Sequence, residues 1–246
     1  MQLFGIDIGG SGIKGAPVDL ETGELTAERF RVETPRPATP DAMAKAVKQL
    51  LDHFKWSGPV GVGFPTIVSK GQCKSMSNLH KDWVNVHIDK LFKSVCGNDF
   101  VVINDADAAG LAEMSYGAGK GEDGLVVTIT LGTGIGSGVF HDGKLIPNFE
   151  FGHLRYKKFK PVEKYAADSI RKHKKLKLTE WAERLDYFFN YLNRVCSPDL
   201  IIVGGGASKR WEELEPLLST NVRLEVARTK NEAGIIGAAM ASKDFL

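Results

Sequence analysis

The sequence has few cysteines and no long apolar run, and each absence excludes a class of protein. Its 246 residues include only three cysteines, Cys73, Cys96 and Cys196. An odd number at wide spacings is not typical of a disulfide framework or a zinc knuckle, so we expect reduced thiols. No apolar run approaches the roughly 20 residues of a membrane helix, and the first ten residues resemble no secretory signal. We therefore expect a cytoplasmic protein with no membrane partner.

Charge is balanced over the whole chain but not along it. The chain has 32 Lys and Arg and 30 Asp and Glu, which gives a formal net charge of +2. Residues 155–177 hold ten basic side chains against two acidic ones, a net charge of +8, which leaves −6 on the rest. An ordinary solvated loop and helix face would have this composition, and so would a docking surface for a polyanion. The sequence leaves both interpretations open.

Glycine is in excess, with 27 residues that gather in clusters. The first cluster is a turn between two predicted strands. A second turn follows them, and then a third strand that we expect through residues 25–33. Helical spacing of apolar residues predicts helices over 41–54 and 179–195. Compact apolar runs at 60–64, 100–103 and 200–203 are typical of buried strands in a mostly parallel sheet.

The opening pattern returns from Leu125. Sliding the chain by 122 residues places residues 10–13 on residues 132–135, which matches Gly-Ser-Gly-Ile to Gly-Thr-Gly-Ile. We infer an internal duplication, with two similar α/β halves that face one another across a cleft. Loops at strand ends are where such folds bind ligands.

The glycine clusters predict a phosphate-binding site. Backbone N–H groups cradle phosphates best in turns without a Cβ, and hydroxyl or ammonium groups beside them add donors. Neither duplicated cluster fits the Walker pattern, and either one alone could be a tight hairpin turn. The candidate donor-binding residues are Asp7, Gly9, Gly10, Ser11, Gly12, Lys14, Gly132, Thr133, Gly134, Gly136, Gly204, Gly205 and Gly206.

Two carboxylates at predicted strand ends are candidates for chemistry. Asp7 precedes the first Gly turn, where it could hold a hydrated Mg²⁺ near phosphate oxygens or simply shape the turn. Asp105 follows the run at 100–103 and begins a predicted helix. It could take a proton from a hydroxyl nucleophile, or it could be a helix N-cap.

At this point the sequence resembles a known family. Its motifs FGIDIGGSGIKG, FPT, NDADAAGLAE, LGTGIGSG, EFGH and PDLIIVGGGAS are similar, in order and over essentially the whole chain, to those of the ROK sugar kinases. The resemblance implies an actin-like ATPase (ribonuclease H-like) fold. It implies a small domain of residues 1–104 with a returning C-terminal helix at 231–246, a large domain of residues 105–230, and a homodimer.

The resemblance also implies roles for single residues. Asp105 would be the catalytic base and Asn104 its sugar-binding neighbour. The sugar hydroxyls would also be bound by Glu150 and His153 of the EFGH motif, by Glu163, and by Asn78, a weaker match. Charged and amide side chains read such hydroxyls well.

One departure from the family narrows the expected activity. Many members carry a cysteine-rich zinc motif after E-x-G-H, whereas this chain has LRYKKFKPVEKY, so we expect no zinc site. The chain resembles most the branch that phosphorylates glucose at the 6-hydroxyl with inorganic polyphosphate, with ATP as a further donor and Mg²⁺ as cofactor. No helix-turn-helix segment precedes the first strand, so we expect no nucleic-acid partner. The alternatives are a strictly ATP-dependent hexokinase acting on glucose, mannose or an amino sugar, and a non-catalytic sugar-sensing regulator.

Overall fold

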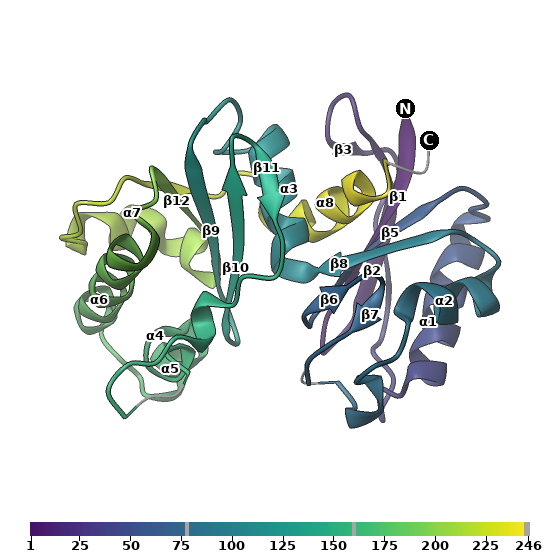
Figure 1. Cartoon of the computed structure of the whole chain (residues 1–246), viewed down its shortest axis with the longest axis horizontal. Helices are drawn as coiled ribbons and strands as arrows, with labels where there is room; N and C mark the ends of the chain where they lie inside the picture. The colour runs from purple at the N-terminus through teal and green to yellow at the C-terminus, as the bar shows by residue number, and fades with distance from the viewer. Residues whose placement is uncertain (77–78, 159–160, 244–246) are drawn as a thin grey trace. The chain divides into compact units, whose positions relative to one another are not determined.

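The computed structural model describes residues 1–76, 79–158 and 161–243, and it divides into two compact units (Figure 1). Unit 1 contains Met1–Ala112 and Glu232–Leu246, and unit 2 contains Glu113–Asn231. The division falls inside α3 (Asp105–Tyr116), after Ala112, whereas the sequence analysis placed it after Asn104. Among the described residues, no helix combines the length and the apolar character that a membrane span requires.

Unit 1 is built on a sheet whose strand order is β3-β2-β1-β5-β8. The strand β1 pairs antiparallel with β2 and parallel with β5, and β5 pairs parallel with β8. All five residues of β5 are buried, as a strand covered on both faces requires. The bounds of the strands are β1 Gln2–Ile8, β2 Ile13–Asp19, β3 Glu24–Leu25, β4 Phe30–Val32, β5 Val60–Phe64 and β8 Phe100–Asn104, with the small hairpin of β6 Val68–Ser69 and β7 Gln72–Cys73 beside them.

The third strand expected over 25–33 is two short strands instead. Both β3 and β4 pair with β2, but at opposite ends of it. Between the two paired stretches lies Pro17, which has no N–H to donate and therefore cannot continue the ladder on that side. Its carbonyl oxygen still accepts a hydrogen bond from the N–H of Thr26.

Helices cover both faces of the unit 1 sheet. The helix α1 (Pro40–Phe54) lies where the apolar spacing predicts it, and Thr39 caps it, with a proline in the first turn. The C-terminal helix α8 (Ala233–Ala241, yellow in Figure 1) lies against β1 and β5, where Gly5 and Gly61 leave room for its backbone. The C-terminal helix thus belongs to unit 1, together with the first strand of the chain. The other helices of the unit are η1 Lys81–Trp83, α2 Ile88–Cys96 and the first part of α3.

Unit 2 repeats the opening hairpin. The strands β9 (Leu125–Leu131) and β10 (Ile135–His141) pair antiparallel around the second Gly turn, as β1 and β2 do around the first, which confirms the duplication. The sheet order is β11-β10-β9-β12-β13, and β12 runs parallel to β9. The remaining elements are β11 Lys144–Ile146, η2 Phe151–His153, α4 Glu163–Ala166, α5 Asp168–His173, α6 Leu178–Cys196, β12 Leu200–Gly205, η3 Gly206–Arg210, α7 Trp211–Leu214, η4 Glu215–Leu217 and β13 Leu224–Val226, with η5 Lys230–Glu232 leading back to α8.

Candidate active site

The first Gly turn joins β1 to β2 and carries four of the predicted donor-binding residues. The N–H of Gly9 donates to the carbonyl oxygen of Gly12 at 3.0 Å and closes the turn. A Cβ added to Gly10 would meet no atom within 4 Å, so the space beside the tip of the turn is open. Ser11 is exposed there. The turn can therefore present backbone and hydroxyl donors to an anion.

Asp7 ends β1 next to this turn, opposite Lys14 of β2. The Lys14 Nζ lies 3.7 Å from the Asp7 Oδ2. Burial raises the pKa of Asp7, and the charge and hydrogen bond of Lys14 offset this only in part. The helix α8 contributes to the burial, because a Cβ on Gly234 would lie 3.0 Å from the Asp7 Cγ.

Asp7 suits a loosely held Mg²⁺. This ion prefers oxygen ligands, keeps several waters, and is commonly bound by one or two carboxylates together with substrate phosphates. Over the described part of the chain, no group of three or more His, Cys, Asp or Glu side chains is placed to hold a metal ion. A Mg²⁺ beside Asp7 would therefore depend on the phosphates of the donor.

We expect the substitution Asp7→Asn to raise the free energy of unfolding at neutral pH. The pKa of Asp7 is higher in the folded chain than in the unfolded chain, so stability falls as the pH rises from about 4 through the folded pKa. The amide avoids this cost at neutral pH, and the gain should shrink near pH 3, where the carboxyl is mostly protonated in both states. Thermal unfolding at the two pH values measures this. A variant that melts below wild type at neutral pH would contradict the argument.

Asn104 and Asp105 lie where β8 passes into α3. The Asn104 Oδ1 accepts hydrogen bonds from the N–H groups of Ala106 at 2.8 Å and Asp107 at 3.1 Å, so Asn104 acts as the N-cap. The Asp105 side chain is half-buried, and its Oδ1 also accepts from the Ala106 N–H, at 2.9 Å. The role of N-cap, which was the alternative interpretation of Asp105, therefore belongs to Asn104. The second oxygen of Asp105 is not engaged in that contact.

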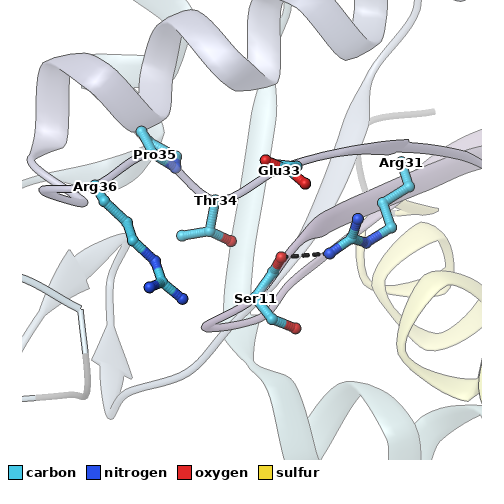
Figure 2. A pocket seen from close by; sticks show the side chains of 6 residues that line it. All are labelled: Ser11, Arg31, Glu33, Thr34, Pro35 and Arg36. Atoms are coloured by element: carbon cyan, nitrogen blue, oxygen red, sulfur yellow. Dashed lines mark hydrogen bonds between the residues drawn. The ribbon is translucent and has the colours of Figure 1, made fainter.

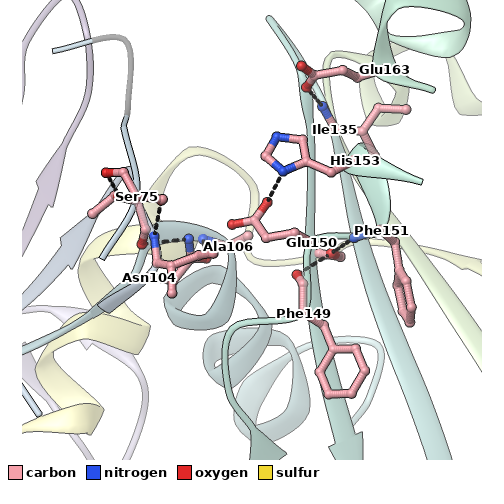
Figure 3. A network of polar contacts seen from close by, with 12 residues as sticks. Ser75, Asn104, Ala106, Ile135, Phe149, Glu150, Phe151, His153 and Glu163 are labelled. Carbon is pink, nitrogen blue, oxygen red and sulfur yellow. Dashed lines mark hydrogen bonds and ion pairs between the residues drawn. The ribbon is translucent and has the colours of Figure 1, made fainter. Parts of the chain in front are cut away.

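A small network, not predicted from the sequence, holds Asn104 in place. The Asn104 Nδ2 donates to the carbonyl oxygen of Thr66 at 3.1 Å, and the Thr66 hydroxyl lies 2.7 Å from that of Ser75 (Figure 3). The FPT motif that ends at Thr66 was the available signal. Asn78, the weaker sugar-binding candidate, lies outside the described residues.

The second Gly turn is closed by its own backbone and supported by one residue of α5, Ser169. The Gly132 N–H donates to the Gly134 carbonyl oxygen at 3.0 Å. Ser169, which the sequence analysis missed, donates its hydroxyl to the Thr133 carbonyl oxygen at 2.6 Å and its N–H to the Gly132 carbonyl oxygen at 3.0 Å. The only local signal was the Asp-Ser pair at the start of α5. No atom lies within 4 Å of a Cβ added to Gly132, so this turn is also open.

Glu163 links the predicted sugar-binding group to this turn. Its Oε2 accepts a hydrogen bond from the Ile135 N–H at 3.3 Å, and a Cβ on Gly134 would lie 2.3 Å from the same oxygen. Glycine at 134 is therefore required for the carboxylate to approach. Glu163 is a predicted sugar-binding residue and Gly134 a predicted donor-binding residue, and the two lie next to each other within unit 2.

Glu150 and His153 form an ion pair at a turn fastened to β10. The His153 Nδ1 lies 4.0 Å from the Glu150 Oε2 (Figure 3). Ser137 of β10 holds the segment, because its hydroxyl donates to the Phe149 carbonyl oxygen and accepts from the Phe151 N–H at 2.9 Å. Burial raises the pKa of Glu150, with an added contribution from the charge of Glu163, while His153 acts in the opposite direction.

The third glycine cluster packs against α5. Gly205 adopts a φ of +74°, and Gly206 leaves room for Asp168, whose Oδ2 would lie 2.6 Å from a Cβ there. The buried Asp168 pairs with the Arg171 Nε at 2.7 Å and the Lys172 Nζ at 2.6 Å. Burial alone would raise the pKa of Asp168, but hydrogen bonds from these two cations outweigh it and lower the pKa. Two cations of the basic stretch thus stabilise unit 2.

The comparisons with known proteins agree with this organisation. The model of the ROK family matches residues 3–164. A polyphosphate glucokinase of Mycobacterium tuberculosis is 45% identical over 97% of this chain and 90% of its own length. The crystal structure of an inorganic polyphosphate/ATP-glucomannokinase from Arthrobacter sp. strain KM is 46% identical, covers 100% of this chain and 99% of that one, and superposes with a TM-score of 0.94.

The fold extends to more distant structures. A ROK family glucokinase from Streptomyces griseus, solved with glucose and AMPPNP, has a TM-score of 0.81 at 24% identity, over 99% of this chain and 100% of that one. The chain belongs to the ROK family. Its mixed α/β structure is the actin-like ATPase fold of the ROK sugar kinases, which confirms the fold expected from the motifs.

Proposed function

We propose that the protein transfers a phosphoryl group to the 6-hydroxyl of glucose, with inorganic polyphosphate as donor and ATP as a second donor. The observation that carries the proposal is similarity over nearly the whole chain, at 45% and 46% identity, to a polyphosphate glucokinase and a polyphosphate/ATP-glucomannokinase. The open Gly turns and the half-buried carboxylate of Asp105 supply the groups that this chemistry needs.

In this mechanism Asp105 accepts the proton of the sugar hydroxyl as the hydroxyl oxygen attacks the terminal phosphorus. The bond between that phosphorus and the bridging oxygen breaks, and the shortened polyphosphate or ADP leaves. The two Gly turns hold the donor phosphates through backbone N–H groups, a preorganised arrangement that stabilises developing negative charge. Asn104, Glu150, His153 and Glu163 bind the sugar hydroxyls.

The cofactor in this proposal is Mg²⁺ beside Asp7, where it would offset negative charge on the phosphates. Within the chain, Lys14 performs part of the same task, because its ammonium group lies at the carboxylate next to the first turn. A homodimer and a cytoplasmic location remain predictions from the family resemblance and the sequence composition.

A donor comparison tests the proposed function. Glucose 6-phosphate should form from both polyphosphate and ATP with one enzyme preparation, and a chelator should stop both reactions by removing Mg²⁺. Product from ATP alone would replace the proposal with a strictly ATP-dependent hexokinase. Glucose binding without product from either donor would point to a sugar-sensing regulator.

A further inference from the structure

A hollow in unit 1 opens beside the first Gly turn and is not explained by the roles assigned so far. Its volume is about 610 Å³, within the range of roughly 300–1,000 Å³ typical of small-molecule sites. One wall is Ser11 of the Gly turn. The other is β4 together with the segment that follows it, and the lining is Ser11, Arg31, Glu33, Thr34, Pro35 and Arg36 (Figure 2).

The strand β4 and the segment after it are each fastened to the Gly turn, at Arg31 and at Thr34. Arg31 pairs with Lys14 in the register of β4 and β2, and its guanidinium donates to the Ser11 carbonyl oxygen. The same guanidinium lies against Gly12, where a Cβ would be 2.5 Å from the Arg31 Nε. Thr34 donates its hydroxyl to the Gly9 carbonyl oxygen at 2.6 Å. The wall of the hollow is therefore hydrogen-bonded directly to the predicted donor-binding turn.

The charges of the lining favour an anion. The lining contains two arginines and only one carboxylate, that of Glu33, whose side chain is exposed. Within the described residues, neither Arg36 nor Glu33 has an ion pair or side-chain hydrogen bond, so the Arg36 guanidinium is available and Glu33 is free to turn toward solvent. A guanidinium matches phosphate oxygens through parallel N–H donors. Figure 2 shows the two arginine side chains on either side of Ser11.

We propose that this hollow is a second phosphate subsite, which binds phosphate units of a polyphosphate donor beyond the unit that is transferred. The inference rests on the proposed function and adds Arg31 and Arg36 to the donor-binding residues. A polyphosphate chain continues past the Gly turn with a charge on every unit, so it reaches both arginines. The nucleoside of ATP has no such charges, and the subsite therefore favours long polyphosphate.

The test measures binding directly, without turnover. Titration of the full chain should give a lower Kd for long-chain polyphosphate than for tripolyphosphate. Arg36→Gln should raise the Kd for the long chain roughly tenfold, as the loss of a charge-assisted hydrogen bond predicts, and should make its salt dependence shallower. Arg31→Lys keeps the charge but loses the paired donors, so it should also weaken binding of the long chain.

The matched control is Lys90→Gln, which removes an exposed positive charge from α2 in the same unit, outside the lining. It should leave the Kd for long polyphosphate unchanged. Equal Kd values for Arg36→Gln and Lys90→Gln, or no preference of the wild type for the long chain, would overturn the subsite. Failure to form glucose 6-phosphate from polyphosphate would overturn the proposed function instead, while the ratio of the two Kd values would still decide the subsite.

Discussion

Replacement of Asp105 with asparagine should lower kcat by at least roughly 10²-fold, because general-base catalysis contributes about 10²–10⁴-fold. The side chain sits at the first turn of α3, and its Oδ1 accepts from the Ala106 N–H. An amide oxygen preserves that acceptor but cannot take the proton of a sugar hydroxyl. We therefore expect the Kd for glucose to change little. Initial rates at saturating substrates, with glucose binding measured separately, give both values.

The matched control for this prediction is Asp41→Asn. Asp41 also lies in the first turn of a helix, α1, and is exposed. Both substitutions remove a negative charge from a helix N-terminus, which typically costs 0.3–1 kcal/mol of stability. Only Asp105→Asn should lose turnover. Near-normal kcat in that variant would remove Asp105 from the role of base.

Replacement of Gly61 with alanine should destabilise the protein by about 3 kcal/mol, the upper part of the usual range for overpacking. Gly61 on β5 and Gly5 on β1 are partners in register, and together they form the surface on which α8 lies. A Cβ on Gly61 would lie 1.6 Å from the Ala238 carbonyl oxygen. Because the obstacle is helix backbone, α8 has to move, and Asp7 loses part of its support at Gly234. Denaturant unfolding measures the change.

Gly10→Ala is the matched control in the same unit. Its Cβ would meet nothing within 4 Å, and its backbone is outside the region that disfavours alanine. Alanine at such a position restricts the unfolded chain, so stability should be unchanged or slightly higher. Equal destabilisation by Gly10→Ala and Gly61→Ala would mean that the contact with α8 is not the cause.

The local pattern of the sequence was sufficient for the two Gly-turn hairpins, the buried strands and the two long amphipathic helices, and it supplied the candidate site residues. The Gly turns after β1 and β9 lie between apolar runs, and 122 residues separate them, so the duplication is readable without coordinates. Asp7 and Asp105 were found because they adjoin strand ends, where a side chain is at the edge of a sheet. The motifs then identified the family.

Contacts between distant residues required the tertiary structure, because no local pattern encodes them. Ser169 supports the turn at Gly132 and Thr133, and Glu163 reaches the same turn at Gly134, each across more than 25 residues of sequence. The divided third strand depends on where Pro17 of β2 interrupts pairing. The basic stretch shows the same limit. Its positive charge is evident from the composition. The pairing of Arg171 and Lys172 with the buried Asp168 is evident only from the tertiary structure.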